Sequence, residues 1–164
     1  MYLLGLLLGE VIMYVLKKEI FVNEPIDKVF EFFNTPLNLQ KITPPFMNFK
    51  LLTPGKIVMK DGAVFDYKIS LLGIPIRWTS YICDYDPPYQ FSDIQLQGPH
   101  SYWHHQHIFE SVDNGTLIKD IVHYEMPFGF LGRLGNFFIG KPLNNAMFNH
   151  RTKVVESLFG QDER

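Results

Sequence analysis

Apolar and polar residues alternate along most of the chain, a pattern that is typical of strands burying one face of a sheet. The alternation predicts seven strands, over residues 14–22, 49–52, 64–72, 74–85, 91–97, 102–112 and 117–126. After the first strand, apolar residues recur at helical spacing over residues 26–33, and Asn23 is expected to cap this helix. A second short helix is expected over residues 37–42, before a proline-rich break.

Beyond Pro127 the apolar period changes from that of a strand to that of a helix. A long helix is predicted over residues 131–158, with Pro142 kinking or restarting it. Its core-facing residues are expected to be Leu143, Met147, His150, Val154 and Leu158. No other long apolar element is available to cover the buried sheet face. The pattern therefore predicts an α+β helix-grip fold, in which a curved antiparallel sheet wraps around the C-terminal helix and two short helices follow strand one.

The last three predicted strands carry polar groups at positions that the alternation assigns to the buried face. A plain sheet core would be aliphatic, because burying an unpaired polar group costs about 1–3 kcal/mol. An apolar wall with a few orienting polar groups is typical of a cavity that binds a small molecule. The expected ligand-binding residues are Tyr67, Trp78, Asp93, Gln95, Trp103, His105, His107, Asp120 and Tyr124.

The dipeptide Asn114-Gly115 indicates a tight hairpin turn, which sets the expected register of the last two strands. With these two residues as the loop, the expected facing pairs are Phe109 with Asp120, His107 with Val122, and His105 with Tyr124. Asp120 would then lie diagonal to His107, within hydrogen-bonding reach. Two histidines and a carboxylate could form a metal triad. Since no third spaced ligand motif is present, a satisfied histidine–carboxylate pair is expected instead, with no metal and no cofactor.

A turn centred on Pro99 would place Asp93 near His105, which raises an enzymatic alternative. A carboxylate and an imidazole in a partly dry cavity could act as general acid and base. In this alternative His105, tuned by Asp93, removes a proton next to a carbonyl group. Tyr124 or Tyr67 would then donate a hydrogen bond to the oxyanion. The preferred interpretation is a polar network that orients a ligand, and a partner-binding module without ligand is a second alternative.

Composition restricts the expected partners and cellular location of the protein. The net charge is −2 and basic residues are scattered, so a nucleic acid is not the expected partner. Cys83 is the single cysteine, which excludes an intrachain disulfide and favours the reducing cytoplasm. Residues 1–12 are largely apolar but shorter than the roughly 20 residues of a membrane span. They are expected to be an extension or a mis-assigned start before a domain at 13–160; if native, their leucines need burial against the domain or in a homodimer.

The chain resembles the START-like, or SRPBCC, superfamily, which includes polyketide cyclase/dehydrase-like proteins, lipid-transfer domains and the birch pollen allergen type. The opening motifs are PIDKVFEFF from Pro25 and PLNLQKITPP from Pro36. Four further stretches are similar to one bacterial subgroup: GIPIRW from Gly73, FSDIQLQGP from Phe91, WHHQHIFE from Trp103 and PFGFLGRLG from Pro127. The resemblance covers residues 14–159 and implies the helix-grip fold. It leaves function open, since the superfamily includes carriers, cyclases, hydrolases and partner-binding modules.

Overall fold

The computed structural model describes residues 12–55 and 57–160, in which seven strands form one sheet in the order β1-β7-β6-β5-β4-β3-β2. The strands are β1 (Tyr14–Val22), β2 (Lys50–Leu51), β3 (Val64–Leu71), β4 (Ile74–Asp86), β5 (Gln90–Gln97), β6 (Tyr102–Val112) and β7 (Gly115–Glu125). Every neighbouring pair is antiparallel. Each strand that the alternation predicts is therefore confirmed, with small shifts of its ends.

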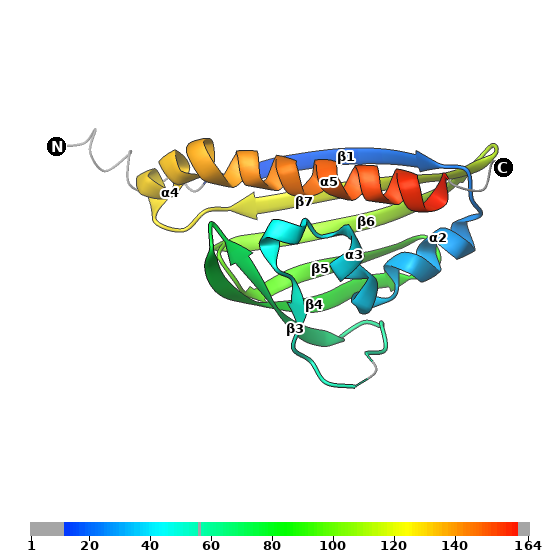
Figure 1. Cartoon of the computed structure of the whole chain (residues 1–164), viewed down its shortest axis with the longest axis horizontal. Helices are drawn as coiled ribbons and strands as arrows, with labels where there is room; N and C mark the ends of the chain where they lie inside the picture. Colours follow the sequence, from blue (N-terminus) through cyan, green and yellow to red (C-terminus); the bar gives the residue numbers. More distant parts are fainter. Residues whose placement is uncertain (1–11, 56, 161–164) are drawn as a thin grey trace.

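Helices cover one face of this sheet. Between β1 and β2 lie α2 (Ile26–Phe33), a 3-10 turn (Pro36–Asn38), α3 (Leu39–Ile42) and a second 3-10 turn (Pro45–Met47). After β7 follow α4 (Gly129–Gly135), a π-helical segment (Asn136–Gly140) and α5 (Lys141–Phe159). Figure 1 shows α5 running along the β1 and β7 side of the sheet, while α2 and α3 lie nearer the central strands. The predicted helix-grip fold is confirmed.

The N-terminal boundary of α2 differs from the prediction. Asn23 does not cap this helix; Pro25 occupies the N-cap position and no side chain caps it. Pro25 has a φ of −59°, close to the helical value, and its carbonyl accepts the hydrogen bond from the Val29 N–H at 3.1 Å. The helix therefore begins directly after the proline, which leaves Asn23 too far from the first free N–H groups to cap them.

The buried face of α5 is also different from the predicted one. The side chains that α5 buries are Asn144, Phe148, Arg151, Val155 and Phe159. Leu158 is exposed, and Met147 and Val154 pack against the core from the edge of this face. The prediction followed the apolar residues and therefore identified a neighbouring face of the helix. Two of the residues that point at the sheet, Asn144 and Arg151, are polar. Pro142 does restart the helix, in the first turn of α5 and directly after the π-helical segment.

The segment at the start of the C-terminal helices leaves large apolar side chains exposed. These are Phe128, Phe130, Leu131, Leu134, Phe137, Phe138 and Ile139. None of the described helices has the length and apolar character needed to cross a bilayer. The expectation for residues 1–12 concerns a segment that lies, except for Ile12, outside the described residues.

Candidate ligand-binding cavity

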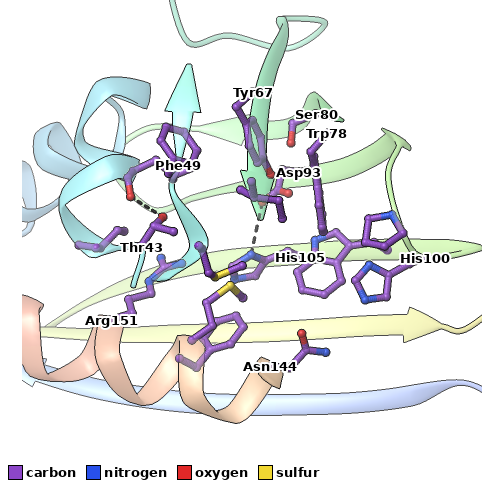
Figure 2. Close-up of a pocket in the computed structure, with 18 of the residues that line it drawn as sticks. Thr43, Phe49, Tyr67, Trp78, Ser80, Asp93, His100, His105, Asn144 and Arg151 are labelled. Carbon is purple, nitrogen blue, oxygen red and sulfur yellow. Dashed lines mark hydrogen bonds and ion pairs between the residues drawn. The ribbon is translucent and has the colours of Figure 1, made fainter. Parts of the chain in front are cut away.

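A cavity of about 290 Å³ lies between the concave face of the sheet and the helices. Strand alternation positions its wall: Phe65 and Tyr67 on β3, and Trp78 and Ser80 on β4, are inward residues of the same hairpin. Most of the wall is apolar, including Phe49, Trp103, Phe148, Met47, Met59 and Met147. Figure 2 shows Tyr67, Trp78 and Ser80 extending toward this space from the sheet above, with Asn144 and Arg151 on α5 below.

Aromatic rings form one end of this cavity. Tyr67 stacks on Trp78 with their ring centroids 5.8 Å apart, and Trp103 meets Trp78 edge-on at 5.2 Å. His100, from the connection between β5 and β6, lies 4.7 Å from Trp103. Burial of the His100 imidazole lowers its pKa to about 4, so it is neutral at pH 7 and behaves as one more aromatic wall residue.

A polar cluster lies on the sheet side of the cavity, where β5, β6 and β7 meet α5. His105 and His107, alternate residues of β6, have their ring centroids 3.8 Å apart. Asp93 of β5 lies directly opposite His105, as the sequence predicted. Asp120 of β7 and Arg151 of α5 complete the cluster, with Arg151 Nη2 at 3.1 Å from Asp120 Oδ1.

The register that brings Asp120 here corrects the predicted pairing of β6 with β7. His107 faces Asp120, His105 faces Val122 and Phe109 faces Ile118. The turn is formed by Asp113 and Asn114, because Val112 pairs with Gly115. Asn114 supplies the positive φ of 69° that the turn requires. Gly115 is instead needed for packing, since a Cβ there would lie 2.1 Å from the Val22 carbonyl oxygen. The register shift on β7 is an even number of residues, so the residues predicted to point inward still do so.

Hydrogen bonds determine which nitrogen of each histidine carries the proton. Arg151 Nη2 donates to Nδ1 of His107 at 3.1 Å, so the His107 proton is on Nε2, which donates to Asp93 Oδ2 at 2.9 Å. His105 donates its Nε2–H to Asp120 Oδ1 at 2.9 Å. His105 Nδ1, which then carries no proton, lies 3.4 Å from Asp93 Oδ2 (Figure 2).

The charges in this cluster follow from burial and from Arg151. Burial, followed by the neighbouring His107, lowers the pKa of His105 to about 4, so His105 is neutral at pH 7. Burial acts to raise the pKa of Asp120, but the Arg151 guanidinium and the bond from His105 hold it well below its usual value. Burial also acts to raise the pKa of Asp93, but the hydrogen bond from His107, together with the charges of the neighbouring histidines and Arg151, lowers it. Asp120 thus pairs directly with the buried guanidinium, and Asp93 is held through His107.

Three residues of this cluster also form a candidate metal site. Ligand atoms of Asp93, His105 and His107 lie within 4.8 Å of one another, a spacing that could hold an ion. A metal on Nε2 of His107 would move the proton to Nδ1, where Arg151 already donates. The hydrogen bonds therefore favour a network satisfied within the protein, and the absence of a metal stays a prediction.

Of the residues that the sequence selected, six line the cavity: Tyr67, Trp78, Asp93, Trp103, His105 and His107. Three do not belong to its wall in the described structure. The side chain of Gln95 is bonded to His100, donating to its carbonyl oxygen at 2.7 Å. Tyr124 donates its hydroxyl proton to Asn136 Oδ1 at 3.2 Å, and Asp120 lies behind the two histidines.

Sequence reasoning missed Arg151 and Asn144, which extend from α5 into the site. Both residues lie at helical spacing with Phe148 and Val155, which was the available signal. A search for apolar periodicity misses such a face, because two of its five buried residues are polar. His100 was missed for a different reason: it lies in a connection, where neither strand nor helix periodicity indicates an orientation.

Comparison with known proteins supports the fold assignment. No family model and no curated protein sequence matches the chain. Among solved structures, a Chromobacterium violaceum protein matches with a TM-score of 0.69 at 13% identity, covering 91% of this chain and 99% of that one. An aromatase/cyclase from a Streptomyces species matches with a TM-score of 0.67 at 17% identity, covering 93% and 97%. A major latex-like protein from Panax ginseng matches with a TM-score of 0.62 at 14% identity, covering 90% and 97%. These matches confirm the START-like resemblance at the level of the fold.

Proposed function

We propose that the protein binds one small, largely apolar molecule in the cavity between the sheet and α5. The observation that carries the proposal is the cavity itself, about 290 Å³ of space walled by aromatic and methionine side chains. A well-packed core leaves few voids larger than a water molecule, so a space of this size in the centre of the fold indicates a ligand. The solved structures with the same fold include an aromatase/cyclase, which is compatible with binding of an aromatic-containing molecule.

The enzymatic alternative is favoured by one specific observation, the environment of His105. Asp120 accepts a hydrogen bond from the proton-bearing Nε2 of His105, which leaves Nδ1 of this cavity-lining ring free of a proton, 3.4 Å from Asp93. A neutral imidazole oriented by a carboxylate is the arrangement of a general base. Of the two tyrosines considered as oxyanion donors, Tyr67 lines the cavity, whereas Tyr124 is bonded to Asn136 outside it. In this alternative His105 removes a proton next to a carbonyl and Tyr67 donates to the oxyanion.

Native mass spectrometry of protein purified from cells tests the proposed function. We expect either a co-purifying small molecule or one-to-one uptake of a lipid or polyphenol from a panel. Absence of any bound or absorbed compound would contradict ligand binding and favour a partner-binding module.

The variant His105→Gln separates a carrier from an enzyme. For an enzyme, turnover is abolished while affinity stays within about tenfold, a loss below about 1.4 kcal/mol. For a carrier, affinity falls and no substrate is turned over by either protein. The matched control is His104→Gln, one residue earlier on β6 and on the opposite face of the sheet, which should change neither property.

A further inference from the structure

The cavity wall contains hydrogen-bond donors that the protein itself does not satisfy. Among the described residues, four buried N–H groups of cavity-lining side chains have no partner: Trp78 Nε1, Trp103 Nε1, Asn144 Nδ2 and Arg151 Nε. Leaving a buried polar group unsatisfied costs about 1–3 kcal/mol. The one buried acceptor without a partner in the described chain, Asp120 Oδ2, lies outside the cavity wall. The unmet requirement of the cavity is therefore for acceptors.

These donors are separated along the cavity. Asn144 and Arg151 lie two helical turns apart on the buried face of α5, about 10 Å along its axis. Figure 2 shows Asn144 at the end formed by Trp78 and His100, and Arg151 at the opposite end beside Thr43. Trp103, whose ring contacts Trp78, adds its N–H to the first group. Two donor groups thus lie at opposite ends of an apolar space.

The charge of the cluster at the Arg151 end restricts which acceptor fits. Asp120 already pairs with the guanidinium there, and Asp93 adds a second carboxylate that accepts from the neighbouring His107. A further anion would add to this excess of negative charge in a buried site, which is unfavourable. A neutral oxygen acceptor accepts the same hydrogen bonds without that cost.

Resting on the proposed function, we infer that the ligand is an elongated, uncharged apolar molecule that carries a carbonyl-type oxygen acceptor at each end. One oxygen accepts from the group formed by Trp78, Trp103 and Asn144. The other accepts from Arg151. Rings between the two oxygens pack against the aromatic wall, including Phe148 of α5.

A series of three compounds with one apolar body tests this inference: biphenyl, 4-acetylbiphenyl and 4,4′-diacetylbiphenyl. Dissociation constants are measured on the full chain through quenching of tryptophan fluorescence, which reports on the cavity because both tryptophans of the protein line it. We expect affinity to increase by about tenfold with each added carbonyl group, as each satisfies buried donors.

The variant Asn144→Leu tests the assignment of one end. It should lower the gain of the diacetyl over the monoacetyl compound to well below tenfold, with each affinity taken relative to that of the same variant for biphenyl. Its control is Asn145→Leu, the adjacent residue of α5, which is outside the cavity wall. Equal affinities for all three compounds on the wild-type protein would overturn the acceptor inference but leave the proposed function in place. Failure of all three to bind would overturn both.

Discussion

Replacing Arg151 with methionine is expected to lower the free energy of unfolding by about 3–5 kcal/mol. Arg151 is 7% exposed, and its guanidinium lies 3.1 Å from Asp120 Oδ1 and 3.1 Å from His107 Nδ1. Methionine keeps much of the apolar stem but removes the cation that pairs with Asp120 and helps to lower the pKa of Asp93. The buried Asp120 and the half-buried Asp93 would then have to remain charged without this cation or take up a proton. Urea denaturation at pH 7, followed by circular dichroism, measures the loss.

Two further variants show whether the loss has an electrostatic cause. Lys153→Met removes a cation from the exposed side of the same helix and should change stability by no more than about 0.5 kcal/mol. Combining Asp120→Asn with Arg151→Met removes one unpaired carboxylate and should recover part of the loss. The double variant should therefore lose less stability than the sum of the two single variants. If Arg151→Met proves as stable as Lys153→Met, the ionised buried cluster described here is wrong.

Replacing Ser80 with phenylalanine is expected to weaken the binding of 4-acetylbiphenyl by at least about 100-fold, a loss of about 2.7 kcal/mol or more. Ser80 is 2% exposed and points from β4 into the cavity between Trp78 and Ile82. A phenyl ring at this position occupies space that the ligand needs, within a cavity of about 290 Å³. Isothermal titration calorimetry measures the affinity, and the melting temperature shows that the variant remains folded.

The matched control places the same ring on the other face of the sheet. Gln106 lies between His105 and His107 on β6, so its side chain points away from the cavity. Gln106→Phe should bind 4-acetylbiphenyl with unchanged affinity. If Ser80→Phe also binds with unchanged affinity, the compound occupies another surface, and the exposed side chains of the segment around Phe137 become the first place to look.

The fold was predictable from sequence because both of its periodicities are strong. Alternation over 64–85 and 91–126 places one side chain in two on the concave face, and this holds even where the predicted register is wrong. The register error at Asn114-Gly115 has a local cause. The turn could be formed by Asn114 and Gly115 or by Asp113 and Asn114, since these residues suit a tight turn. Which pair forms it depends on the close approach of Gly115 to Val22, a contact from outside the hairpin.

The candidate site was predictable on the sheet side and not on the helix side. Asp93, His105 and His107 stand out because polar residues interrupt the inward face of aromatic strands. Arg151 and Asn144 lie on a face of α5 that is buried only because of the part of the sheet against which the helix packs. From sequence alone an arginine is expected at the surface, unless the carboxylates that pair with it in the fold are known. Those carboxylates come from β5 and β7, and the fold of the sheet determines that they lie opposite α5.

The central claim, that a small apolar molecule binds in the internal cavity, is tested most directly by nitrogen-15 nuclear magnetic resonance of the two tryptophan side chains. The chain contains two tryptophans, Trp78 and Trp103, and both indole N–H groups belong to the cavity wall and have no partner in the described protein. Titration with 4-acetylbiphenyl is predicted to shift both indole signals and to saturate at one equivalent. Indole signals that stay in place while the compound binds would contradict the account.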